Sequence, residues 1–584
     1  MQSKIIKTLI FSALILFLFT GIAAAQEWVV TAPGDIDKVN LSTVNPDNMT
    51  LREAIGKAAS GDTILFADNI SAVSTVYGTL NISKDLTIGG DSKVTVARDS
   101  GSVTPSFSIF AVSGGTVVFK HLSIENGNLV NGTGGAVTVD SASVVFDSCT
   151  IQRNRGDFGG AVYVANGSNV KFITSSIYRN NAVTDGSAIY VKNGTVELQN
   201  SIISGHSDKY NVIRLDQGKI IASQSRVIDN TVTSKGSPLN ASAGTVVEFR
   251  NSTFSNNTAT ESAGIMTSGT LLVENCVFNG GITSGNGGGI SLGSGSNGTV
   301  KSSVFSNSTV TGDGGGISIS AGSTVSVDTC TFFNNSANYG GAVFSRGTVN
   351  ANAVTAVNNT AKFYGGALAF WNDGDTTLTK SAIAGNTAKS NNTAKDIGGG
   401  GLNISNSRAV LSDNVIVGNT DPRSIDFGEF NASVQSGGRN LVGTYNGSGR
   451  FPIDSADAAG LQPADLFVIE NGLPSLTKAT GQTAGFDNIP VYTIALNSSS
   501  SNPAAGILGD GRTQPPAPEP QEPQDPSSGS EVNQTPGAEP PAESGSSLLM
   551  YLILGIIAVI LLVVIAVGIV FFLIYREKRK YKFG

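Results

Sequence analysis

The sequence predicts an all-β protein that winds as a parallel β-helix, and two observations carry this prediction. First, a short unit recurs roughly every 24 to 27 residues: a small residue, an apolar residue two positions later, an asparagine three after that, and a glycine-rich turn. Residues 329–343 are one copy. Second, apolar and polar residues alternate within each unit, as where Val170 and Phe172 flank Lys171. A strand-like alternation inside a repeat of this length is typical of one coil of a parallel β-helix.

Stacked coils should align equivalent residues in three interior columns. The first holds small or thiol side chains, namely Cys149, Ser175, Ser201, Ser252, Cys276, Ser303, Cys330 and Ser381. The second is apolar: Ile124, Ile151, Ile177, Ile203, Val227, Phe254, Phe278, Phe305, Phe332, Val354 or Ala356, Ile383 and Ile416. The third is a predicted structural ladder of asparagines at Asn154, Asn180, Asn230, Asn257, Asn335, Asn386 and Asn419. Asparagine suits a corner because it hydrogen-bonds the backbone and tolerates left-handed dihedral angles.

Composition narrows the function classes. Charged residues are only 14% of the 584 residues, Gly is abundant at 71, and the net charge is -7, which argues against a nucleic-acid partner. Cys276 and Cys330 fall two coils apart, about 9.6 Å at the β spacing, which is too far for a disulfide. We therefore expect free, buried thiols, with no metal site and no cofactor.

The two ends of the chain predict a membrane-anchored surface protein. Residues 1–25 have the pattern of a secretory signal peptide, with an uncleaved membrane anchor as the alternative. Residues 512–547 are rich in Pro, Glu and Ser and predict a disordered stalk. The apolar run 548–575 is long enough for a transmembrane helix, and the basic tail 576–584 should be cytoplasmic. We expect a single-pass protein of the cell membrane with the bulk of its chain outside.

Between these ends, residues 26–79 predict an N-terminal cap, 80–420 the β-helix repeats, and 421–511 terminal coils and a C-terminal cap. The cap contains a predicted helix over 50–59, with Asn48 or Thr50 as its N-cap. Arg52 and Glu53 in that helix are interpreted as cap surface, because adjacent helical residues point apart.

Three segments resemble known families of surface proteins. Residues 50–55 with Gly61-Asp62-Thr63-Ile64 are similar to the N-terminal CSLREA element, with Met49-Thr50 in place of its Cys-Ser. The apolar-x-x-Asn and Gly-Gly-Ala pattern, seen at 151–162 and 332–343, resembles the polymorphic outer-membrane protein repeat and the adhesin-like proteins of methanogenic archaea. Residues 436–443 and 502–506 resemble the closing region of choice-of-anchor proteins. The resemblance implies a right-handed parallel β-helix in an archaeal cell envelope.

An extracellular chain of this kind would be a glycoprotein. Asn-x-Ser/Thr acceptor sequences are scattered along it, for example at Asn131, Asn166, Asn193, Asn297, Asn358 and Asn446.

Catalytic chemistry has few candidates. A lyase or hydrolase would need carboxylates at equivalent positions of neighbouring coils, and Asp157 and Asp185 are the closest fit. His206 stands where the ladder would place an asparagine, so we interpret it as a ladder substitute, with Asp208 beside it as a lead for an enzyme. We name no catalytic residue.

The best candidate for binding is the stretch Phe370 to Asp375, an aromatic pair followed by Asp373 and Asp375. By alternation, either Phe370 or Trp371 must face outward, where it could stack on a sugar or a partner protein. We therefore predict an adhesin-like or envelope protein that binds glycans or surface proteins. A membrane-tethered polysaccharide lyase or glycoside hydrolase is the first alternative, and a purely structural coat component is the second.

Overall fold

The computed structural model describes residues 25–36, 45–101, 105–372, 374–390, 398–446, 454–470, 473–485, 489–496, 503–504 and 508. The predicted stalk, transmembrane helix and basic tail lie outside these residues, as does the predicted signal peptide apart from Ala25. Asp373 also lies outside them.

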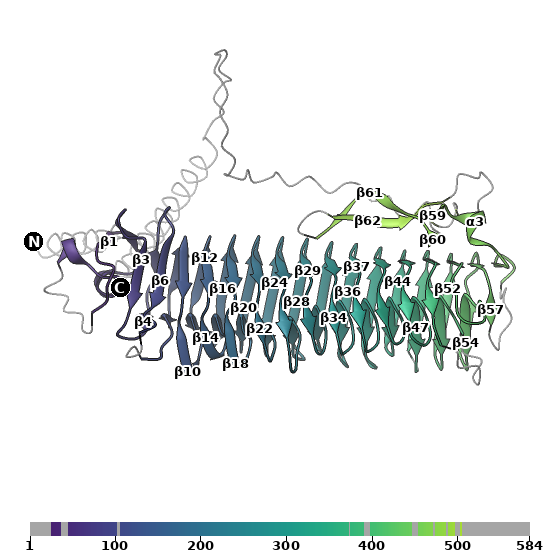
Figure 1. Ribbon diagram of the computed structural model, residues 1–584, viewed down its shortest axis with the longest axis horizontal. Coiled ribbons are helices and arrows are strands. Elements are labelled where there is room, and N and C mark those ends of the chain that lie inside the picture. Colours follow the sequence, from purple (N-terminus) through teal and green to yellow (C-terminus); the bar gives the residue numbers. More distant parts are fainter. Residues whose placement is uncertain are drawn as a thin grey trace, which may run out of the picture. The chain divides into compact units, whose positions relative to one another are not determined.

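The chain forms a parallel β-helix built on three long sheets (Figure 1). One coil consists of β40 (Thr324–Asp328), β41 (Thr331–Phe333), the short β42 (Ser336–Ala337) and β43 (Val343–Ser345). Strands equivalent to β40 form sheet A, those equivalent to β41 form sheet B, and those equivalent to β43 form sheet C, with 16, 16 and 15 strands respectively. Each strand pairs in parallel with its counterpart one coil later. The fold predicted from the repeat is thus confirmed.

The parallel pairing extends beyond residues 80–420 at both ends. Sheet A begins with β1 (Glu27–Val30) and β2 (Asp62–Phe66), and sheet B with β3 (Ala72–Thr75). After residue 420, β54 (Phe427–Phe430) and β55 (Ser433–Ser436) continue sheets C and A, and β58 (Ala458–Ala459) closes sheet B. The end coils have lost the repeat motif but keep the backbone pairing.

Stacked phenylalanine rings fill the interior of the middle coils. Phe278, Phe305 and Phe332 lie on β33 (Val277–Asn279), β37 (Val304–Ser306) and β41, and all are buried. Adjacent ring centroids are 4.8 Å apart with interplanar angles of 1° and 10°. This distance matches the spacing of paired strands, so the parallel register sets the stacking. In the next coil Ala356 pairs with Phe332 and so occupies the apolar column, while Val354 lies outside it.

The small-residue column also forms a ladder of hydrogen bonds from coil to coil. The backbone N–H groups of Cys149 and Ser175 donate to the hydroxyls of Ser175 and Ser201 one coil on, at 3.0 and 3.1 Å. The three cysteines are free and buried, as expected. Burial raises the pKa of each thiol to about 12, so none is a thiolate at neutral pH.

The helix of the N-terminal cap is α2 (Leu51–Lys57), and Thr50 is its N-cap in a capping box with Glu53. The interpretation of Arg52 as cap surface is wrong. Its guanidinium donates to both carboxylate oxygens of Asp35 at 2.7 and 2.8 Å and to the carbonyl of Gly78 at 2.6 Å. The side chain of Arg52 is only 15% exposed. Because the segment around Asp35 is far from the helix in sequence, helical periodicity alone could not reveal this ion pair.

The C-terminal segment packs on the outer face of the later strands of sheet B. It comprises α3 (Pro463–Leu466), the hairpin of β59 (Ile469–Glu470) and β60 (Leu473–Pro474), and the hairpin of β61 (Leu476–Ala484) and β62 (Ile489–Ile494). Gly485 donates its N–H to the carbonyl of Asn275 at 2.6 Å, and Ala484 packs with the outward-facing Val277 and Val304. The second hairpin therefore lies along the later coils of the solenoid (Figure 1).

Candidate functional site

Five aromatic side chains gather on the outer side of sheet C. They come from β43, from β47 (Leu368–Trp371) and from the turns that precede these strands. The ring centroid of Trp371 lies 4.5 Å from that of Tyr339, 5.8 Å from Phe344 and 6.4 Å from Tyr364. Phe363 stacks on Tyr339 at 4.9 Å. We call Tyr339, Phe344, Phe363, Tyr364 and Trp371 the aromatic patch.

The alternation of β47 creates the patch. Leu368 and Phe370 point into the solenoid and are buried, whereas Trp371 points outward and is half-buried. The indole Nε1 of Trp371 donates to Oδ1 of Asn403 at 2.7 Å, which fixes the ring orientation. Of the two aromatic residues singled out in the sequence, the structure therefore places Trp371 at the surface and Phe370 in the core.

Charged groups of both signs surround the patch. The guanidinium of Arg346 lies 5.3 Å from the ring centroid of Phe344, and the ammonium of Lys362 lies 5.0 Å from that of Phe363. Burial raises the pKa of Asp313, and burial together with the charge of Asp313 raises the pKa of Tyr339. The patch thus offers aromatic faces beside fixed hydrogen-bonding groups, a combination that suits sugar rings or a protein surface.

Asp375 makes a different contact. It begins β48 (Asp375–Thr379) in sheet A, and both of its carboxylate oxygens accept from Arg408 on β52 (Arg408–Ser412), at 2.8 and 2.9 Å. The hydrogen bond from Arg408 holds the pKa of Asp375 below its ordinary value. Asp375 therefore belongs to an exposed ion pair on sheet A.

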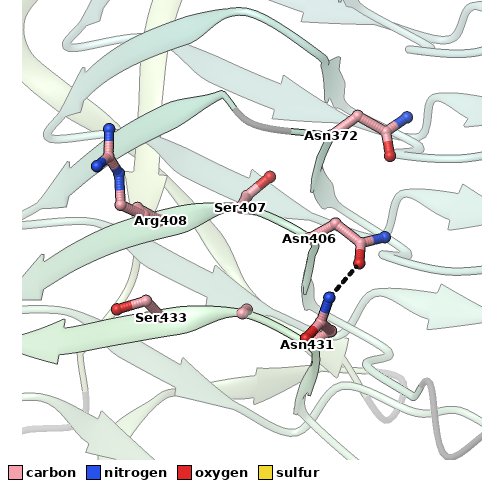
Figure 2. Close-up of a pocket in the computed structure, with 7 residues that line it drawn as sticks. Asn372, Asn406, Ser407, Arg408, Asn431 and Ser433 are labelled. Carbon is pink, nitrogen blue, oxygen red and sulfur yellow. Dashed lines mark hydrogen bonds between the residues drawn. The ribbon is translucent and has the colours of Figure 1, made fainter.

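A shallow polar groove of about 940 Å³ lies over the turns of the last coils (Figure 2). Its lining residues are Asn372, Asn406, Ser407, Arg408, Asn431, Ala432 and Ser433. Asn431 donates to Asn406 at 2.8 Å, and the three asparagines have positive φ angles of 58°, 49° and 47°. Left-handed turn asparagines stacked in register account for this groove.

The seven predicted ladder asparagines are all buried. Asn335 is representative: its Oδ1 accepts from the N–H of Ser308 at 3.1 Å, and its Nδ2 donates to the carbonyl of Phe305 at 2.9 Å and to Oδ1 of Asn359 at 3.0 Å. Asn359, which the repeat pattern did not reveal, continues the ladder to Asn386. These amide groups form hydrogen bonds with neighbouring coils, so they hold the corner of the solenoid together.

His206 occupies a position in this ladder. The backbone N–H of His206 donates to Oδ1 of Asn230 at 3.1 Å, and its ring Nδ1 lies 3.1 Å from the same oxygen. On the other side of the ring, Nε2 lies 3.5 Å from Nδ2 of Asn180. Burial lowers the pKa of His206 to about 4. Asp208 instead accepts from Asn181 and from the N–H of Ala182, at 2.9 and 2.7 Å.

The buried imidazole predicts a pH-dependent stability. Between pH 6.5 and about 4 the unfolded chain binds a proton at His206 that the folded chain does not. The free energy of unfolding therefore falls as the pH drops through this window, by about 3 kcal/mol in total. His206→Asn keeps the ladder and should remove this part of the pH dependence. Urea unfolding of both proteins at pH 7 and pH 4.5 tests it, and an equal loss of stability in the two would contradict the assignment.

Of the two carboxylates considered for catalysis, Asp185 is held by neighbouring groups. Asp185 accepts from Nδ2 of Asn211 at 2.9 Å and lies 3.8 Å from Arg214, and burial raises its pKa. Asp157 is half-buried on β14 (Arg155–Phe158). Among the described residues, no group of three or more His, Cys, Asp or Glu side chains is arranged to hold a metal ion.

The six candidate glycosylation sites lie at the surface. Asn131, Asn166, Asn193, Asn297 and Asn358 are exposed, and Asn446 is half-buried. Asn131, Asn166 and Asn358 have positive φ angles; Asn166 and Asn358 lie in turns, and Asn131 lies in β10 (Asn128–Thr133) where its pairing with β14 is irregular.

Comparison with known proteins agrees with the fold. The family model for a right handed beta helix region matches residues 81–219 and 208–361. Together with the parallel sheets, this match supports a right-handed parallel β-helix fold. None of the curated proteins matches it at a significant level.

One solved structure, described as "a new PL6 alginate lyase complex with trisaccharide", is 10% identical. The match covers 82% of this chain and 95% of that chain, with a TM-score of 0.28. A likeness at this level does not bear on what the present chain binds. Within the part of the chain that the structure describes, no helix has the length and apolar character needed to cross a membrane.

Proposed function

We propose that this protein is an adhesin-like binding protein that holds glycans on the aromatic patch of its β-helix. The observation that carries the proposal is the outward indole of Trp371, fixed by Asn403 and surrounded by the rings of Tyr339, Phe344 and Tyr364. Sugar rings present C–H faces that pack on aromatic faces and hydroxyls that bond to charged groups at their edges. Arg346 and Asp313 supply such groups.

The proposal includes a place for the protein at the cell surface. Residues 1–25 would direct secretion, 512–547 would form the stalk, and 548–575 would anchor the chain in the membrane, with 576–584 in the cytoplasm. Protease added to intact cells should then remove the β-helix while an antibody epitope on the tail stays protected. Protection of the β-helix from protease would contradict this topology.

Trp371→Ala tests the binding site. Loss of the central ring should lower glycan affinity at least tenfold, which corresponds to about 1.4 kcal/mol. Tyr178→Ala is the matched control, because Tyr178 is also a half-buried aromatic residue but lies on sheet B beside Arg179. Titration of the full chain with a retained glycan measures both variants. Equal affinity of the wild type and Trp371→Ala for the glycan would show that the aromatic patch is not the binding site.

The competing functions are a polysaccharide lyase or glycoside hydrolase and a structural coat component. A lyase releases unsaturated chain ends, a hydrolase releases new reducing ends, and a coat component retains no glycan. The same titration, followed by analysis of the glycan for new ends, separates the three.

A further inference from the structure

A second cluster of aromatic and charged side chains lies on sheet C, several coils before the aromatic patch. Tyr163 and Tyr190 stack with ring centroids 5.7 Å apart and an interplanar angle of 17°. The hydroxyl of Tyr190 donates to Asp216. Arg214 lies 2.8 Å from Asp216 and 3.8 Å from Asp185. We call these five residues the tyrosine cluster.

The tyrosine cluster is held together by its own contacts and is partly exposed. Tyr190 is buried, with its hydroxyl held by Asp216 and its ring contacted edge-on by Phe158 at 5.0 Å. Tyr163, half-buried, keeps part of its ring accessible to solvent. The side chains of Arg214 and Asp216 are 22% and 33% exposed. The cluster thus presents one ring face with fixed polar groups beside it, as the aromatic patch does.

The strand register places both clusters in one outward column of sheet C. Tyr163 pairs with Tyr190, and the pairing continues through Arg214, Asn240, Met266, Ser291 and Ser318 to Phe344 of the aromatic patch. These seven steps correspond to about 34 Å along the solenoid. Sheet C can be followed from β4 (Leu80–Ile82) to β57 (Tyr445–Asn446) in Figure 1.

Between the tyrosine cluster and the aromatic patch, the outer face of sheet C carries mostly short polar side chains. Asn240, Met266 and Ser291 are half-buried, and the neighbouring outward column carries Ser242 and Ser268. Hydroxyl or amide side chains thus recur along these two columns, with Met266 between Asn240 and Ser291. A ligand with its own regular repeat of hydroxyl groups fits such a surface.

The charges at the two ends indicate what kind of chain fits. In the tyrosine cluster the carboxylates of Asp185 and Asp216 flank a single guanidinium, that of Arg214. At the aromatic patch Arg346 acts on Asp313, and Lys362 lies beside the ring of Phe363. The first end disfavours a polyanion and the second disfavours a polycation, which leaves an uncharged chain.

We propose that the outer face of sheet C binds one unbranched, neutral polysaccharide along the solenoid, with the tyrosine cluster as a second aromatic platform beyond the patch. This inference rests on the proposed glycan binding and adds its substrate class and its second contact. Joining two weak contacts through one ligand raises affinity by making the second contact intramolecular.

The test is a length series of unbranched neutral β-glucan and mannan, from disaccharide to polymer, titrated into the full chain, with polygalacturonate as the charged comparison. The polymer should bind at least tenfold more tightly than the disaccharide. Tyr163→Ala should remove this gain. Tyr163→Phe, which keeps the ring, should keep the gain, and Tyr178→Ala is the folding-matched control.

The outcomes separate the two proposals. Disaccharide binding that depends on Trp371 but shows no gain with length, or a gain that Tyr163→Ala does not reduce, overturns the extended site and leaves the proposed function standing. Tighter binding of polygalacturonate overturns the neutral substrate class. Absence of binding by every glycan, short or long, overturns both proposals.

Discussion

Phe305→Ala is expected to destabilise the middle of the solenoid by about 3–5 kcal/mol. Phe305 is fully buried and lies 4.8 Å from both Phe278 and Phe332, so its removal leaves a cavity between two rings that the strand pairing holds apart. The strands cannot move together, because their spacing is fixed by backbone hydrogen bonds.

Hydrogen exchange is the appropriate measurement for Phe305→Ala, because each coil contacts mainly its neighbours and a long solenoid need not unfold in one step. Peptides from β33 to β41 should lose protection, while those from the first coils should not. Phe430→Ala is the control, since Phe430 is 38% exposed. Comparable loss of protection in the two variants would show that stacking contributes little.

Asn335→Ala should have an effect of similar size. Its side chain accepts from the buried N–H of Ser308 and donates to the carbonyl of Phe305 and to Asn359. Truncation leaves these buried groups without that partner, at about 1–3 kcal/mol for each unsatisfied group. Because Oδ1 of Asn359 still accepts from the backbone N–H of Asn335, two groups lose this partner, and the expected loss of stability is about 2–6 kcal/mol.

The neighbouring Asn334 supplies a matched control for Asn335→Ala. It is exposed and has a φ of 57°, a conformation that glycine also adopts, so Asn334→Gly keeps the turn. Urea unfolding and hydrogen exchange should separate a strongly destabilised Asn335→Ala from a nearly unaffected Asn334→Gly. If both variants behave alike, the buried ladder is not what holds this corner.

The interior of the solenoid could be predicted because it depends on residues within one repeat. The spacing from small residue to apolar residue to asparagine is the same wherever all three occur, so the repeat alone places Phe332 and Asn335 in their columns. Asn359 escapes this pattern because the apolar residue that precedes it is Ala356, which is a weak hydrophobic signal. Only the register with Phe332 identifies it.

The outer surface depends on how coils of unequal length are aligned, and the sequence does not give that alignment. Tyr163 and Tyr190 are 27 residues apart, and Tyr190 and Arg214 are 24 apart, yet all three share one column. Alternation predicts that one of Phe370 and Trp371 faces outward. The neighbours of Trp371, Tyr339 and Tyr364, come from turns, where no alternation applies.

The sequence of the later strands of sheet B indicates that another segment packs on their outer side. Outward positions of sheet B change from Ser176 and Arg226 in earlier coils to Val304, Ala382 and Val415 in later ones, and the later ones are buried. Apolar residues on an outward column indicate that another segment covers them.

The most direct test of the central claim is a glycan array probed with the full chain in mild detergent, read for both retained glycan and newly formed chain ends. We expect retention of unbranched neutral glycans, no new reducing or unsaturated ends, and loss of retention in Trp371→Ala. Release of unsaturated or newly reducing products, or no retention of any glycan, would contradict it.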